Sequence, residues 1–125
     1  MPFSNAISVQ EWQLIAFFEV EPSRLENDPD LSWPYNDYTY QRKVDEFDIT
    51  FGLAPYYKDF SLVVRRGEQK HIELCVLSAF DVQYHQNGGT EWLELAITEN
   101  QRLELRLKPF FSLKGDFKFR PYGVS

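Results

Sequence analysis

Cysteine and long apolar runs are both scarce in this chain. Cys75 is the one cysteine, so no internal disulfide can form, and we expect the protein in a reducing compartment, the cytoplasm. The apolar stretch 14–18 is far shorter than the roughly 20 residues that a membrane-spanning helix needs. It also lacks the preceding Lys or Arg that is typical of a secretory signal. These absences predict a cytoplasmic protein that does not interact with a membrane.

Positive charge is in short supply as well. The chain has 19 acidic residues against 13 Lys and Arg, which gives a net charge of −6 and argues against a nucleic-acid binder that relies on neutralising phosphates. The charge is uneven, because residues 1–50 carry ten acids and three bases, whereas residues 101–125 carry two acids and six bases. Such polarity either steers a charged partner or pairs the two ends of the chain with each other, and we favour the pairing.

Apolar and aromatic side chains are abundant. Of the 125 residues, 43% are hydrophobic and 17% aromatic, which predicts a single packed domain, 1–125, that is rich in strands. Apolar and polar residues alternate, as at 47–53, with the period of two that a half-buried strand requires. We expect a mainly β fold at the margin of the α+β class: an antiparallel meander of about seven to nine strands, forming a twisted sheet or a two-layer sandwich. The expected strands are 36–44, 46–54, 60–66, 70–77, 79–86, 91–98 and 102–108, with a last pair near 110–113 and 116–120.

The segment before these strands predicts a short helix and then a loop. Ser8 and Glu11 have the spacing of a reciprocal helix cap, which favours a helix over about 8–18 that ends before Pro22. Apolar residues in 12–20 also alternate as they would in a strand, so a strand remains the alternative. The stretch 21–33 is acidic and contains two prolines, which is typical of a surface loop.

The sequence HQNGGT at 85–90 lies between two alternating segments and favours a hairpin turn over a phosphate-binding loop. A phosphate loop needs a helix after it and a lysine at fixed spacing, whereas the residues that follow HQNGGT alternate as a strand does. Asn-Gly is the strongest short signal of a hairpin. We predict a two-residue turn at Asn87-Gly88, and a turn at Gly88-Gly89 would keep the same faces aligned.

Two further hairpin loops follow from the rule that opposed residues share a face of the sheet. A three-residue loop at 99–101 would place Leu95 opposite Leu105. A loop of the same length at 67–69 aligns the apolar residues of the strands on either side of it. Both expectations rest on the alternation of leucine, isoleucine and valine with polar residues.

Candidate catalytic and metal-binding side chains are few. His71 and His85 show no metal-ligand spacing, and we expect both on solvated sheet faces. Cys75 lies in an apolar strand, and we expect it to be packed and inert. Motifs for a serine nucleophile are absent. We therefore expect no catalytic activity, no metal and no cofactor, and an enzyme that uses these three side chains is only a third hypothesis.

The segment 33–40 contains four aromatic residues in eight, and a tyrosine pair follows at 56–57. Tyrosine and tryptophan are enriched at binding hot spots, because each buries a large area and keeps a polar tip. The alternative is that some of these rings cover the core. The candidate binding residues are Trp33, Tyr35, Asp37, Tyr38, Tyr40, Arg42, Tyr56 and Tyr57.

Together, charge and aromatic content predict a non-catalytic, acidic interaction domain. Its partner would be another protein, for example a basic protein that it neutralises, or a second copy of the chain. A β domain that binds a small molecule or a carbohydrate is the alternative. Nucleic acid is not an expected partner, for the reason of charge given above.

Overall fold

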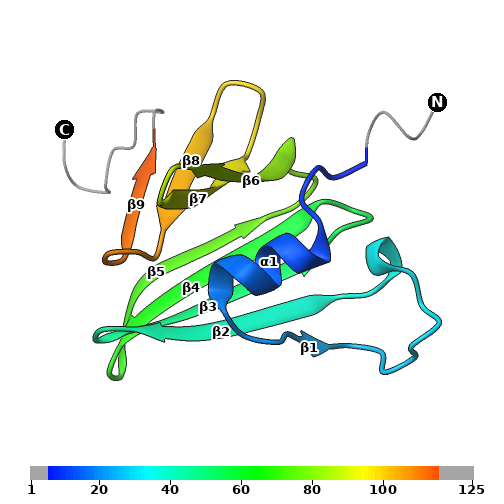
Figure 1. Ribbon diagram of the computed structural model, residues 1–125, viewed down its shortest axis with the longest axis horizontal. Helices are drawn as coiled ribbons and strands as arrows, with labels where there is room; N and C mark the ends of the chain where they lie inside the picture. The colour runs from blue at the N-terminus through cyan, green and yellow to red at the C-terminus, as the bar shows by residue number, and fades with distance from the viewer. Residues whose placement is uncertain (1–5, 116–125) are drawn as a thin grey trace.

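The computed structural model describes residues 6–115, which form a mainly β fold with one short α-helix (Figure 1). Antiparallel strands form two sheets, a five-stranded sheet in the order β1-β2-β3-β4-β5 and a four-stranded sheet in the order β6-β7-β8-β9. The predicted antiparallel meander is therefore confirmed, in two sheets. The elements are α1 Glu11–Phe18, β1 Ser23–Arg24, β2 Tyr38–Val44, β3 Phe47–Ala54, β4 Asp59–Arg66, β5 Gln69–Val76, β6 Asp81–Asn87, β7 Thr90–Ala96, β8 Arg102–Arg106 and β9 Ser112–Gly115, with a 3-10 turn, η2, at Trp33–Tyr35.

One hydrophobic core joins the helix to both sheets. Figure 1 shows α1 lying across the first sheet, and the helix also contacts β6 and β7 of the second. Phe18 stacks on Tyr40 of the first sheet, with ring centroids 5.3 Å apart, and Phe17 meets Tyr84 of the second edge-on at 6.4 Å. Burying a phenylalanine stabilises a fold by about 1.5–3 kcal/mol, so these two neighbours are a principal tie between the sheets.

The helix is confirmed, but its cap is not the predicted one. α1 begins at Glu11, and the backbone N–H of Gln10 donates to Oε1 of Gln13 at 2.8 Å. The N–H of Ser8 instead donates to Oδ1 of Asp81 at 2.9 Å, and its hydroxyl donates to Oδ2. Asp81 is buried, and a buried carboxylate needs donors. Within the described residues, no helix is both long and apolar enough to cross a membrane.

The sequence HQNGGT forms the turn of a β-hairpin, as predicted, but one residue later than the favoured position. Asn87 pairs with Thr90 across the hairpin of β6 and β7, which places Gly88 and Gly89 in the turn. Gly88 has a φ of +64°, the value that a type II′ turn requires at its first central position. Asn87 therefore belongs to the strand and not to the turn.

The predicted faces are correct, but two loop lengths are wrong. Between β7 and β8, Leu95 lies opposite Leu103 and not Leu105, because the connection spans 97–101 and is closed by a 2.8 Å hydrogen bond from the N–H of Ile97. Between β4 and β5, a bulge after Val64 shortens the predicted loop to two residues. Both changes keep the leucines inward, because the β7–β8 connection is longer by two residues, and the bulge offsets the change of one residue between β4 and β5.

The remaining segments agree with the prediction in part. The stretch 21–33 is mainly loop, although β1 within it pairs with β2. Of the last predicted pair of strands, β9 is present beside β8. The predicted strand 116–120 lies outside the described residues.

Candidate functional site

Two of the eight candidate residues lie in the core and offer nothing to a partner. Tyr38 is 3% exposed and Tyr40 is fully buried, and burial raises the pKa of both phenols. Their strand, β2, lies between β1 and β3, and the two rings are on the face that α1 covers. The prediction that these two tyrosines belong to an exposed surface is wrong, and the alternative that some of the rings cover the core holds for them.

Trp33 and Arg42 also serve the fold. The Trp33 ring lies 4.5 Å from that of Tyr38, whose hydroxyl donates to the Trp33 carbonyl at 3.0 Å. Arg42 donates to the carbonyl of Phe18 at 2.7 Å and pairs with Glu19 at 3.1 Å. A guanidinium at this position stabilises the C-terminus of α1, where the carbonyls have no partners within the helix. Arg42 therefore acts as a helix cap.

The other three tyrosines form an exposed cluster, although they come from distant parts of the chain. Tyr35, Tyr56 and Tyr57 are each between 61% and 65% exposed. The rings of Tyr35 and Tyr56 are 5.4 Å apart, and those of Tyr56 and Tyr57 are 5.1 Å apart. A 3.0 Å hydrogen bond from the N–H of Tyr56 to the carbonyl of Pro34 fixes the β3–β4 turn to η2. We call these three residues the tyrosine cluster.

Two further apolar residues, which the sequence analysis did not single out, lie at the same end of the molecule. Leu77 and Phe80 are exposed in the β5–β6 connection. The N–H of Ala79 donates to the carbonyl of Lys58 at 2.9 Å, which holds this connection against the β3–β4 turn. Figure 1 shows η2, that turn and the connection together at one end of the molecule. We call the tyrosine cluster with Leu77 and Phe80 the aromatic end.

We call residues 26–37 the acidic loop, and its base is held by one buried side chain, that of Asn36. Its Oδ1 accepts from the N–H of Glu26 at 3.0 Å and from that of Asp37 at 2.9 Å, and its Nδ2 donates to the carbonyl of Glu26 at 2.8 Å. The base of the loop is thereby held next to η2. Four exposed acids lie along it and have no ion-pair partner within residues 6–115: Glu26, Asp28, Asp30 and Asp37.

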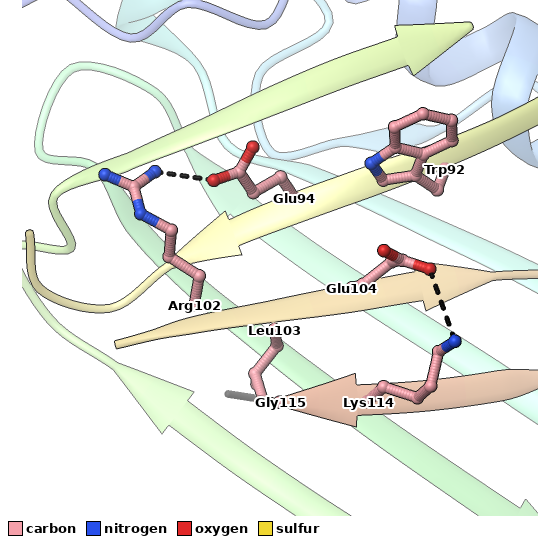
Figure 2. Close-up of a pocket in the computed structure, with 7 residues that line it drawn as sticks. All are labelled: Trp92, Glu94, Arg102, Leu103, Glu104, Lys114 and Gly115. Carbon is pink, nitrogen blue, oxygen red and sulfur yellow. Dashed lines mark hydrogen bonds and ion pairs between the residues drawn. The ribbon is translucent and has the colours of Figure 1, made fainter. Parts of the chain in front are cut away.

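A shallow hollow of about 310 Å³ lies on the outer face of the second sheet, and its charges are already paired (Figure 2). Glu94 pairs with Arg102 at 2.5 Å, and Glu104 lies 4.0 Å from Lys114. Partial burial opposes ionisation of Glu94, but hydrogen bonds from Arg102 and His85 outweigh it and lower the pKa of this carboxyl. Because these charged side chains pair with one another, little unpaired charge remains in the hollow to bind a ligand.

The indole of Trp92 in the same hollow is covered on both sides. The His85 ring stacks on it at 5.2 Å, and the Arg106 guanidinium lies 4.8 Å from its centroid. Because β6 and β8 flank β7 from opposite sides, these contacts occupy opposite faces of the indole. A sugar that stacks on tryptophan needs a free face, so this ring does not provide a carbohydrate platform.

The predicted candidates for chemistry remain separate. His71 meets Phe47 edge-on at 6.2 Å, and His85 pairs with Glu94 at 2.7 Å. Within residues 6–115, no three His, Cys, Asp or Glu side chains are grouped so as to hold a metal ion. Cys75 is exposed, contrary to the prediction of a packed thiol, because Leu74 and its alternating neighbours take the core-facing side of β5.

Comparison with known proteins identifies a shared fold. No protein-family model and no curated protein matches the chain. Among solved structures, a chain from the contact-dependent growth inhibition toxin–immunity protein complex of Klebsiella pneumoniae 342 is similar, with a TM-score of 0.70 and 17% sequence identity. The match covers 89% of this chain and 96% of that chain. At this identity the likeness concerns the fold alone.

Proposed function

We propose that this protein is a non-catalytic, cytoplasmic binding domain that holds a protein partner against the aromatic end. Its role would be that of the inhibitory member of a toxin–immunity pair. The similarity to a chain of such a complex supports this role. The acidic composition supports it too, since charge complementarity speeds association between an inhibitor and its target.

The observation that carries the proposal is the tyrosine cluster. Three neighbouring tyrosines expose most of their ring area, although tyrosine is a residue that folds usually bury in part. Exposed patches of large apolar side chains mark interaction sites, and tyrosine is among the residues that dominate binding energy. Because the β3–β4 turn is bonded to η2, the rings are already arranged before a partner arrives. Such preorganisation lowers the entropic cost of binding.

Site-specific photo-crosslinking in the cells that make the protein tests the proposal. A photoreactive phenylalanine analogue replaces Tyr57 in one variant and Phe110 in the other, since these side chains are 65% and 62% exposed. Phe110 lies in the β8–β9 connection, at the other end of the molecule (Figure 1). We expect the Tyr57 variant to capture one distinct protein and the Phe110 variant not to capture it.

The same experiment separates binding from inhibition. The captured protein, produced alone, should arrest growth, and co-production of the unaltered chain should restore growth. A captured protein that is harmless would overturn the inhibitory role and leave binding intact. Capture of a second copy of the chain, or no capture at Tyr57, would overturn the proposal of a different protein as partner.

A further inference from the structure

We infer that the partner meets the aromatic end with a basic surface whose arginines contact both the tyrosine cluster and the acidic loop. This inference rests on the proposed function and adds the chemistry of the partner. It starts from the distribution of ion pairs. Within residues 6–115 many acids outside the loop are paired, for example Glu11 with Arg24, Glu46 with Arg66 and Glu73 with Lys70. Asp45 and Glu68 form no ion pair there, but they are single acids and not part of a run of unpaired acids.

The acidic loop differs, because it gathers several unpaired acids in one segment, with Arg24 just before it as the nearest base in sequence. Between Leu25 and Gln41 there are four acids and no Lys or Arg. Within residues 6–115, none of these four carboxylates forms an ion pair. Clustered like charges repel one another. A cationic partner reduces that repulsion and is itself attracted by the negative potential of the loop. The loop is therefore complementary to a basic surface.

The loop is also held in position for such a partner. Just before the loop, Arg24 lies opposite Tyr38 in the β1–β2 strand pair. The Asn36 side chain, near the end of the loop, accepts hydrogen bonds from the backbone of Glu26 at its start and of Asp37 at its end. Tyr35 precedes Asn36, whose side chain is bonded to the backbone of Glu26, so the base of the loop adjoins the tyrosine cluster. A central group of aromatic rings with a charged rim is the usual arrangement of a protein-binding hot spot.

Arginine suits this combination better than lysine. The planar guanidinium stacks on an aromatic face and donates to a carboxylate at the same time, which an ammonium group does less well. The chain itself contains an example close by. Arg24 lies 5.7 Å from the Tyr38 ring centroid and donates to Glu11 at 2.5 Å. An arginine of the partner would repeat this geometry with Tyr35 and Asp37.

A titration with model peptides, followed by the amide NMR signals of the protein, tests this chemistry. The probes are hexa-arginine amide, hexa-lysine amide and hexa-glutamate at low salt. We expect hexa-arginine to shift the signals of residues 26–37 and 55–58 in a saturable way and to bind several-fold more tightly than hexa-lysine. Hexa-glutamate should not bind. Raising the salt to about 0.5 M should weaken hexa-arginine binding by roughly tenfold or more, because exposed charges are screened.

Matched charge variants separate this site from net charge alone. The double variant Asp30→Asn, Asp37→Asn removes two acids of the loop, and the control Asp45→Asn, Glu68→Gln removes two exposed acids outside it. We expect the first to weaken hexa-arginine binding at least about fivefold and the control to change it little. Equal weakening by both pairs would overturn the inference, as would shifts spread over the whole surface or equal binding of the lysine peptide.

The partner captured at Tyr57 distinguishes failure of this inference from failure of the proposed function. If that partner binds the unaltered chain and the Asp30, Asp37 double variant equally at low and high salt, the basic surface is wrong and the binding function stands. If nothing is captured at Tyr57, the proposed function itself is wrong, whatever the peptides show.

Discussion

Asn36 is the side chain on which the geometry of the acidic loop depends. It is buried and makes three hydrogen bonds, all of them to the backbone of Glu26 and Asp37. Its sequence neighbourhood gives no hint of this, because an asparagine between tyrosine and aspartate in a polar segment is typical of an exposed turn. The role becomes visible only when Glu26 is seen beside it, ten positions away along the chain.

Replacing Asn36 by alanine should destabilise the protein by about 1–3 kcal/mol, because the amide and carbonyl of Glu26 lose their partners. Equilibrium unfolding in urea measures the change. The neighbouring Asn27, which is exposed, provides the control, and its alanine variant should stay within about 0.5 kcal/mol of the unaltered protein. Equal midpoints for both variants would show that the bonds of Asn36 contribute no stability.

The ionisation of Glu94 should make the free energy of unfolding depend on pH. Its folded-state pKa is lowered from the usual 4.5, because the hydrogen bonds from Arg102 and His85 outweigh partial burial. A lowered pKa gives a contribution that is complete above the unfolded pKa and is lost as pH falls through the folded value. The stability difference between the unaltered protein and Glu94→Gln should therefore be largest near neutral pH and shrink below about pH 4.5. Urea unfolding over a pH series measures it, and a difference that stays constant with pH would contradict this account.

At the scale of elements, alternation predicted the strands well and the loops poorly. A period of two assigns each residue to a face, and a half-buried sheet enforces that assignment, so β2 to β8 are close to their predicted positions. Loop length is free to change in steps of two without exposing a leucine, which is why the β7–β8 connection is longer than expected. The helix cap was misplaced because Ser8 is recruited by Asp81, 73 positions away.

The hairpin of β6 and β7 gives a sharp test at this scale. Gly88 has a φ of +64° and Gly89 does not have a positive φ, although both would leave room for a Cβ atom. Gly88→Ala should therefore cost about 1 kcal/mol through backbone strain alone, and Gly89→Ala should be neutral or slightly stabilising. Thermal unfolding of the two variants measures the difference. Equal effects would mean that the turn does not have this conformation.

At the scale of the whole molecule, the charge asymmetry of the sequence has two outcomes. Lys108, from the basic end of the chain, contacts Glu19 from the acidic end, which is the pairing that the sequence favoured. The acids of the loop form no ion pair within residues 6–115, which is compatible with the alternative, the steering of a charged partner. Charge counts alone could not separate these outcomes, because pairing depends on which segments the fold brings together.

The candidate site was predictable only in part, because the sequence does not show which segments the fold brings together. The segment 33–40 and the pair 56–57 were identified from their aromatic content, and Tyr35, Tyr56 and Tyr57 do form one exposed cluster. Tyr38 and Tyr40 belong to the same aromatic-rich segment as Tyr35, but α1 covers the face of β2 on which their rings lie. Nothing local to those residues indicates what lies above them.

The affinity of the captured partner for alanine variants is the measurement that tests the account most directly. The double variant Tyr35→Ala, Tyr57→Ala should weaken binding, measured by calorimetry, roughly tenfold or more, while its stability changes by less than about 1 kcal/mol because both rings are exposed. Phe110→Ala, at an equally exposed position elsewhere, should bind as the unaltered protein does. If the tyrosine variant keeps its full affinity, the aromatic end is not the binding surface.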